Sequence, residues 1–416
     1  MIAIPALLAL FTSGASAQED DGQDAAPPKK QAAEEEDRTS FEGKAFLGGG
    51  ALAGEGIIAG AGPVAVISAQ AEPALALGPV LIAFPVDLSH RQTFGISLSE
   101  LQGEAALEAG VHPDDGEIAV RGGIRGRYRP GWPDPYQPQA DGTLLPTDRW
   151  SYVAGFVGLD GRWDVAKPVR LSADYEYQRL DSKDDPNFDP VDHPTHIPPE
   201  DGWAHAGEVS LRLRSGPLQV TLGSTLEWKG YLLRYARDAG TGLTHAGPGG
   251  DPPNPLYREI VAEPAVEARL APKGAPWKVR AGYGLEMQED LFEGYYSYLG
   301  HNPTAGLDLA LGEVCEVAVR GEVSLRTYGP DSYAVGGSHP ALDWGDRRVD
   351  RRYGGSVDLD FPVTRSWIVS VSGDALVRRT NFPDYVPGVF PAGGAVDIDW
   401  DYEDLRVLAG VEYTWR

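Results

Sequence analysis

Apolar and polar residues alternate in a series of runs from about Glu117 to the end of the chain. In the run from Val169 to Tyr177, every odd position is apolar or aromatic and every even position is polar or charged. In the final run, from Leu405 to Trp415, every odd position is again apolar or aromatic, and Arg406, Glu412 and Thr414 lie at even positions. A period of two residues is typical of a β-strand with two different faces. The pattern therefore predicts an all-β protein.

Two all-β architectures produce such alternation: a soluble sandwich with one face in water, and a membrane barrel with one face in lipid. The predicted strands run to roughly 10–16 residues, whereas globular strands average about 5–6 and membrane-spanning ones need about 9–11. Short turns alternate with long polar loops, as in transmembrane barrels. Aromatic residues mark both ends of the apolar face, with Trp277, Phe361, Trp367 and Trp415 beside short turns and Tyr177, Trp228, Tyr283 and Tyr353 toward long loops.

We expect a transmembrane antiparallel up-and-down β-barrel of about 16 strands, with 12 or 14 as alternatives. The predicted strands cover residues 44–59, 64–77, 80–89, 93–111, 116–128, 150–163, 168–181, 205–214, 217–232, 257–271, 277–292, 303–312, 314–328, 351–362, 366–380 and 402–416. Residues 41–90 are the least regular part and are either barrel or a plug. Pro73, Pro85 and Pro264 each remove a donor from a proposed strand ladder. An even number of strands puts both termini on the periplasmic side.

The C-terminal run Val407-x-Ala409-x-Val411-x-Tyr413-x-Trp415 resembles the terminal strand signal of bacterial outer-membrane β-barrels. From roughly Lys44 to Arg416, the chain resembles a porin-like barrel of Gram-negative bacteria, although that family usually ends on Phe and Arg416 is the last residue here. The resemblance implies recognition by the barrel-assembly machinery through this strand. It also implies contact with outer-membrane lipid and lipopolysaccharide, and it leaves a homo-oligomer open.

The N-terminus has the form of an export signal. The apolar stretch from Ile2 to Phe11 is followed by Ala15-Ser16-Ala17, which fits an A-x-A cleavage site, although no Lys or Arg precedes the stretch. We therefore expect residues 1–17 to be a signal peptide. Residues 18–40 are of low complexity and acidic, which predicts a disordered periplasmic tail before the barrel at 41–416.

Composition excludes several classes of protein. The chain has 36 Lys and Arg against 61 Asp and Glu, a formal charge of −25, which argues against a nucleic-acid partner. No apolar run reaches the roughly 18 residues of a spanning helix. Cys315 is the single cysteine, so a disulfide framework is excluded. We expect no cofactor.

The polar face of the predicted strands carries charges of both signs, which would line the barrel lumen. Arg121, Arg125 and Arg127 share one face of a strand as a ladder of basic side chains. The other pore-lining candidates are Arg170, Asp174, Glu176, Arg212, Arg280, Glu286, Arg320, Glu322 and Asp374. Such a wall either pairs with itself and fills a narrow barrel or surrounds an aqueous channel.

Two loop segments carry further candidate groups. If the strand count is right, residues 130–148 form the third outer loop, and in porins that loop folds inward to narrow the pore. Here it would place Asp134, Asp141 and Asp148 in a constriction. A second loop contains His193, His196, Asp189 and Asp192, residue types that bind divalent metal ions. A solvated acidic loop is the competing interpretation of that cluster.

The leading functional prediction is a channel for passive diffusion of small polar solutes or ions, without catalysis. The first alternative is a filled structural barrel that displays acidic loops to partners. The second is an outer-membrane lipid-modifying enzyme, which a His–Ser or His–acid cluster near the outer rim would favour.

Overall fold

The structure is a computed structural model, and it describes residues 38–55, 60–94, 98–113, 115–130, 132–138, 144–147, 151–182, 201–236, 254–294, 296–329, 348–380 and 401–415. The predicted signal peptide, 1–17, lies outside these residues, as does most of the predicted tail, 18–40. The first strand begins at Arg38, because residues 38–40 already pair with the second strand. No helix long and apolar enough to cross a membrane occurs in the described part of the chain.

Nineteen strand segments make up the described chain. They are β1 (Arg38–Glu55), β2 (Gly60–Leu77), β3 (Val80–Ala83), β4 (Val86–Thr93), β5 (Leu98–Val111), β6 (Gly116–Tyr128), β7 (Trp132–Pro138), β8 (Leu144–Thr147), β9 (Tyr152–Ala166), β10 (Val169–Ser182), β11 (Gly202–Ser215), β12 (Leu218–Tyr235), β13 (Leu256–Leu270), β14 (Trp277–Asp290), β15 (Tyr298–Leu311), β16 (Cys315–Tyr328), β17 (Val349–Pro362), β18 (Trp367–Thr380) and β19 (Tyr402–Trp415).

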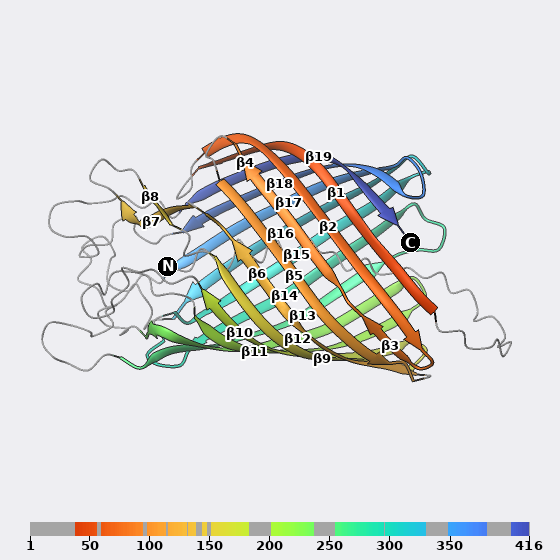
Figure 1. Ribbon diagram of the computed structural model, residues 1–416, viewed down its shortest axis with the longest axis horizontal. Helices are drawn as coiled ribbons and strands as arrows, with labels where there is room; N and C mark the ends of the chain where they lie inside the picture. Colours follow the sequence, from red (N-terminus) through yellow and green to blue (C-terminus); the bar gives the residue numbers. More distant parts are fainter. Residues whose placement is uncertain are drawn as a thin grey trace, which may run out of the picture. The chain divides into compact units, whose positions relative to one another are not determined.

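All strands except β7 and β8 belong to one antiparallel sheet, and β1 pairs with β19 to close it into a barrel (Figure 1). Both β3 and β4 pair with β2 on one side and β5 on the other, so they are two parts of one crossing. The described chain therefore crosses sixteen times. The predicted all-β barrel and its strand number are confirmed, and residues 41–90, where described, belong to the barrel.

The strand that contains Pro85 is interrupted there, because proline has no N–H to donate to the ladder. Phe84 N donates to the Pro73 carbonyl at 2.9 Å before the break, and Ala106 N donates to the Pro85 carbonyl at 3.0 Å after it. Pro264 lies inside β13, where the β13–β14 register has no partner for residues 263–264. The sheet thus accommodates its prolines at gaps in the ladder.

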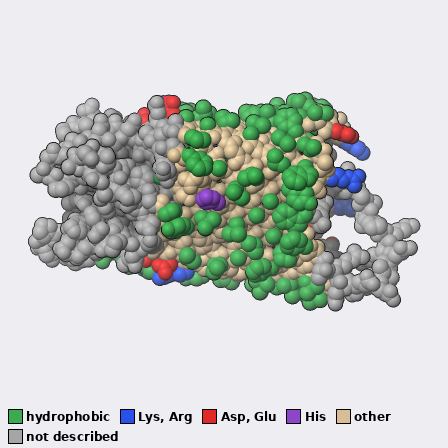
Figure 2. Space-filling view, turned by 45° about the horizontal axis from the view of Figure 1, so that its top comes forward, with side chains coloured by type: hydrophobic (Ala, Val, Ile, Leu, Met, Phe, Trp, Pro, Cys, Tyr) green, Lys and Arg blue, Asp and Glu red, His purple; other side chains and the backbone are tan. Residues whose placement is uncertain are grey.

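Large apolar side chains cover the outer face of the barrel. Leu47 and Ile124 are each 62% exposed and Val153 is 60% exposed, although such residues are normally buried in water-soluble domains. Figure 2 shows hydrophobic side chains spread over the visible face, with described acidic and basic side chains only toward its two ends. A strand of 14 residues rises about 47 Å along its own axis. Strands of that length, tilted as in known barrels, can span an apolar band about 25 Å tall.

Aromatic side chains gather at both ends of this apolar face. At the loop end, the rings of Trp203 and Trp228 lie 4.8 Å apart. At the end with short turns, the rings of Trp367 and Tyr413 lie 4.6 Å apart, and Trp415 is 6.0 Å from Tyr413. Aromatic rings prefer the two membrane–water interfaces. The two groups therefore mark the borders of the apolar band.

The first prediction concerns the seam between β1 and β19. A Cβ atom on Gly50 would overlap the carbonyl group of Val407 in the partner strand, whereas one on Gly321 in β16 would meet nothing within 4 Å. Gly50→Ala should lower the free energy of unfolding by about 1–3 kcal/mol, as overpacking does. Gly321→Ala, the control, should leave stability unchanged or slightly raised. The measurement is urea unfolding in lipid vesicles, and equal stability of the two variants would refute the seam geometry.

Candidate functional site

Charged side chains lie on the face of the strands opposite the apolar one, and they reach each other across intervening strands. Arg121 of β6 and Glu176 of β10 are 3.2 Å apart although β9 lies between them. Arg121 passes over Gly158 of β9, where a Cβ would be 3.0 Å from its Nε atom. Side chains from alternate strands converge on the concave face of a curved sheet. These residues therefore line the inner wall of the barrel.

The structure brings four predicted pore-lining residues together in one cluster. Arg121 contacts Asp174 at 3.5 Å and Glu176 at 3.2 Å, and Arg125 donates to Glu176 at 2.7 Å. The guanidinium of Arg125 also lies over the ring of Phe156, 4.2 Å from its centroid. Asp160 lies 3.6 Å from Arg121 and Glu104 lies 3.5 Å from Arg125, so carboxylates outnumber the two arginines in this cluster.

A second cluster joins two predicted arginines through an acid that the sequence analysis did not select. Arg280 of β14 donates to Asp308 of β15 at 3.0 Å, and Arg320 of β16 contacts the other oxygen of the same carboxylate. Gly306 lies beneath both arginines, since a Cβ there would be 2.8 Å from Arg280 Cγ. The glycine leaves room for two guanidinium groups to reach one acid.

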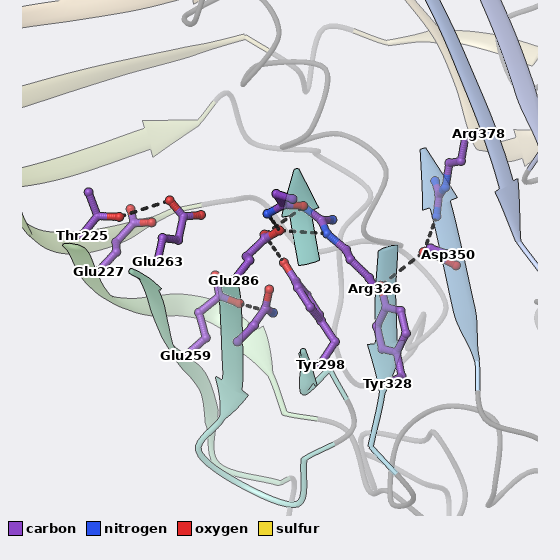
Figure 3. A network of polar contacts seen from close by, with 12 residues as sticks. Thr225, Glu227, Glu259, Glu263, Glu286, Tyr298, Arg326, Tyr328, Asp350 and Arg378 are labelled. Atoms are coloured by element: carbon purple, nitrogen blue, oxygen red, sulfur yellow. Dashed lines mark hydrogen bonds and ion pairs between the residues drawn. The ribbon is translucent and has the colours of Figure 1, made fainter. Parts of the chain in front are cut away.

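Predicted residue Glu286 is the centre of a third cluster (Figure 3). Tyr298 donates its hydroxyl to Glu286 Oε1 at 2.5 Å, and Arg326 donates to both carboxylate oxygens at 2.8 and 3.1 Å. This bidentate pair has the planar geometry that an arginine and a carboxylate favour. It ties β14, β15 and β16 together on the inner wall.

Asp350 collects four donors near the loop ends of β16, β17 and β18. Arg348 and Arg378 each donate to Asp350 Oδ2 at 2.8 Å, Thr380 donates to Oδ1 at 2.5 Å, and Tyr328 donates at 3.3 Å. Figure 3 shows Arg378 and Tyr328 converging on Asp350. The side chains of Arg348, Asp350 and Arg378 are only 1–2% exposed. A buried charge needs such pairing, because desolvation is otherwise costly.

The remaining predicted pore-lining residues have separate surroundings. Arg127 lies over the ring of Tyr152 at 4.9 Å, and Asp374 pairs with Arg406 at 2.8 Å. Arg170 pairs with Asp164 at 2.7 Å beside a short turn. Arg212 of β11 lies opposite Arg170 of β10 in the strand register. The Glu322 side chain lies over Gly354.

Exposure of the inner wall differs along the barrel. In the middle and toward the short turns, Arg121 and Asp174 are 32% and 33% exposed, and Arg280 and Asp308 are 35% and 25% exposed. At the loop end, the Asp350 cluster is almost fully buried. Water therefore reaches the charged wall over much of its length and is excluded near the loops.

Most of the predicted loop residues lie outside the described part of the chain. This applies to Asp141 and Asp148 of the constriction and to all four metal candidates, His193, His196, Asp189 and Asp192. Asp134 lies in β7, which pairs with β8 in a small sheet apart from the barrel ladder. The inward-folding constriction and the metal site stay predictions. Within the described residues, no group of three or more His, Cys, Asp and Glu side chains could hold a metal ion.

Two site residues were missed because strand ends are hard to place from sequence. Asp350 was assigned to a long loop, but β17 begins at Val349 and carries Asp350 inward, where Arg348, which precedes the strand, donates to it. Tyr298 was also placed in a loop, because β15 starts five positions before the predicted strand at 303. The alternation of polar and apolar residues continues through Asp350 and Arg352, so the sequence contained enough information to start this strand before residue 351.

Three histidines of the described barrel pair with hydroxyl groups on strands near the loop end. His205 contacts the Tyr175 hydroxyl at 2.7 Å, and His301 contacts the Tyr283 hydroxyl at 2.5 Å. His90 Nε2 of β4 is 3.1 Å from Ser99 Oγ of β5. His90 alternates with the inward-facing Arg91, so the His90–Ser99 pair lies on the lipid side. The other two pairs also lie on the outer face, but the His90–Ser99 pair has a serine hydroxyl, a group that can act as a nucleophile beside a base, which makes this pair a candidate for function.

The closed barrel, its apolar outer face and its charged inner wall define the class of this protein: a transmembrane β-barrel with the architecture of porin-like outer-membrane proteins. No protein-family model and no curated protein sequence matches the chain.

Solved structures similar to this chain include outer-membrane barrels at low sequence identity. OmpT of Vibrio cholerae is 10% identical, with 92% of this chain and 99% of that chain covered and a TM-score of 0.47. OccAB1 of Acinetobacter baumannii is 10% identical, with coverage of 90% and 97% and a TM-score of 0.47. The anion-selective porin from Comamonas acidovorans is 12% identical, with coverage of 91% and 100% and a TM-score of 0.43.

The second prediction concerns the Asp350 cluster. Asp350→Asn should lower the free energy of unfolding by about 3–5 kcal/mol, because two buried guanidinium groups lose their counter-ion. Asp164→Asn removes the carboxylate of an exposed ion pair with Arg170 and should cost less than about 1 kcal/mol. Urea unfolding of the refolded barrels measures both. A loss for Asp350→Asn no larger than for the control would show that the cluster is not stabilised by its charge.

Proposed function

We propose that this protein is a diffusion channel of the bacterial outer membrane, through which small polar solutes or ions pass without chemical change. The observation that supports the proposal is the partial exposure of ionisable side chains on the inner wall. Arg121 and Asp174 face one another in the middle of the barrel and still leave about a third of each side chain accessible to water.

The physical argument combines strand number with charge. Barrels of 16–18 strands leave an aqueous channel, whereas about eight strands enclose a lumen that side chains fill. A charge transferred into a dry interior costs many kcal/mol unless it is paired and hydrogen-bonded. Part-exposed pairs such as Arg280 and Asp308 therefore support a wet lumen.

The orientation follows from the connections. Transmembrane barrels have short periplasmic turns and longer outer loops. We infer that the short-turn end, where β1 begins and β19 ends, faces the periplasm. The terminal strand β19 pairs with both β18 and β1. That placement supports a role of β19 as the segment read by the barrel-assembly machinery.

The inner wall favours cations, in our proposal, because some of its acids have weak or single partners. Glu263 accepts a hydrogen bond from Thr225 at 3.1 Å (Figure 3). Glu227 pairs with Lys229 at 2.7 Å. Arg121 and Arg125 oppose this preference locally. A ring of charge inside a pore selects ions by sign.

The third prediction tests the channel and its selectivity together. Single-channel recording of the refolded barrel in a planar bilayer should show regular conductance steps, with a reversal potential under a KCl gradient that indicates cation preference. Arg121→Gln should shift that potential further toward cation selectivity, because Asp174 and Glu176 lose a positive partner. Arg179→Gln, on the outer face, is the matched control and should leave it unchanged.

If a correctly folded barrel showed no conductance, the channel proposal would be overturned. Folding is checked by the heat-dependent mobility shift on a gel. A silent folded barrel would favour the filled structural alternative, to which the buried Asp350 cluster already points. An unshifted reversal potential in Arg121→Gln would place the selecting charges elsewhere.

The second candidate function is cleavage of lipid esters, and the His90–Ser99 pair is the observation that favours it. In such a reaction, Ser99 Oγ would attack the ester carbonyl while His90 Nε2 takes the proton and returns it to the leaving alcohol. Water would then attack the acyl-serine with His90 as the base, which releases the fatty acid and restores the Ser99 hydroxyl. No described side chain contacts the other ring nitrogen of His90, so a triad is incomplete. This is why the candidate ranks second.

The fourth prediction separates this candidate from the channel. If the pair is catalytic, a fluorophosphonate probe should label the folded barrel in vesicles, and Ser99→Ala should abolish the labelling. Ser89→Ala is the matched control, because Ser89 lies on the inner face of β4. Absence of labelling, together with absence of fatty-acid release from phospholipid vesicles, would remove the enzyme candidate.

A further inference from the structure

A cup opens at the loop end of β13 and β14. Its cavity has a volume of about 400 Å³ and is lined by Pro255, Leu256, Arg258, Leu291 and Phe292. Among the described residues that line the cavity, four are apolar and Arg258 is the charged one. A cavity of this size and composition suits a molecule with both a hydrocarbon part and an anionic group.

The cup faces outward, toward lipid. Along β13, Tyr257 is 1% exposed and Glu259 is 7% exposed on the inner side, while Leu256 on the opposite side is 38% exposed. Arg258 shares the outer face with Leu256. Among the described residues, no carboxylate forms an ion pair with Arg258.

The height of the cup is set by strand register. Trp228 of the loop-end aromatic group pairs with Ile260, and Gly230 pairs with Arg258. Arg258 therefore lies two residues nearer the loops than Ile260, about 7 Å along the strand, and at the register position of Trp203, which also pairs with Gly230. Because interfacial tryptophans sit at the level of lipid headgroups, the guanidinium lies at or just beyond that level.

The cup is held by the backbone around it. Leu291 N donates to the Arg258 carbonyl at 3.1 Å, and Phe292 N donates to Asp290 Oδ1 at 3.0 Å. Asp290 itself is 4% exposed. Leu291 and Phe292 nevertheless remain 44% and 39% exposed. Two large apolar side chains fixed in exposed positions beside a cation are costly in water and favourable against acyl chains.

We propose that this cup binds a phosphorylated lipid of the outer leaflet, with a phosphate on Arg258 and acyl chain against Leu256, Leu291 and Phe292. An arginine can donate two parallel hydrogen bonds to a phosphate. Glu289 of β14 lies opposite Ile260, which is two residues farther from the loop end than Arg258. Its charge disfavours a phosphate placed deeper and directs the headgroup to the outer side of Arg258.

The fifth prediction tests this site by native mass spectrometry of the full barrel in a neutral detergent, with bis-phosphorylated lipid A as the probe. The wild-type protein should retain one lipid, and dephosphorylated lipid A should bind at least tenfold more weakly. Arg258→Gln should weaken binding of the phosphorylated probe by roughly ten- to a hundredfold, the range of a lost charge-assisted hydrogen bond. Arg179→Gln removes another outward arginine near the loop end and should have no effect.

Two results would overturn the proposal: equal retention of phosphorylated and dephosphorylated lipid, or equal affinity of the wild-type protein and Arg258→Gln. Phe292→Ser should weaken both probes equally, because it removes only the apolar contact. The mobility shift on a gel verifies that each variant is folded. Since lipid retention is read without any current or turnover, the result does not depend on whether the barrel conducts.

Discussion

Backbone hydrogen bonding in a hydrocarbon environment is the constraint on which the rest of this structure depends. A membrane interior offers no water to an unpaired N–H or C=O group, so a sheet that crosses it must have no free edge. The pairing of β1 with β19, from Gly43 with Trp415 to Glu55 with Glu403, removes that edge. Glycines leave room for a ring between β1 and β19: a Cβ on Gly48 or on Gly410 would collide with the ring of Phe46.

Closure separates the two faces of every strand into two environments. The outer face meets lipid and carries Leu, Val, Ile and aromatic side chains, and the inner face carries acids and arginines that must neutralise one another. Along the wall, one carboxylate accepts hydrogen bonds from several donors. Asp308 accepts from two arginines, and Asp350 accepts from two arginines, a tyrosine and a threonine. Clusters that stay part-exposed are compatible with a water-filled lumen. Buried clusters hold neighbouring strands together.

The loop end of the outer face differs from the rest of the lipid-facing surface. There, His205 is paired with Tyr175 and His301 with Tyr283, whereas Arg258 lines a cavity beside apolar side chains. An interface between hydrocarbon and charged headgroups accepts both arrangements, because it supplies water and phosphate within a few ångströms of acyl chains. The outer rim and the lumen are therefore separate chemical surfaces of one barrel.

Alternation along the sequence by itself determined the fold class, because a period of two leaves a strand only two faces and long two-faced strands fit a membrane barrel. It also predicted that Arg121, Arg125, Asp174 and Glu176 share one side of the sheet. It could not show that Arg280 and Arg320 meet at Asp308, since that contact depends on the register of three strands. It also misplaced strand ends, as at Asp350. It identified Pro85 as lacking a ladder donor, but it did not predict that the crossing divides there into β3 and β4. Only the tertiary structure decided these points, because which side chains touch across a barrel depends on strand order, stagger and closure rather than on local pattern.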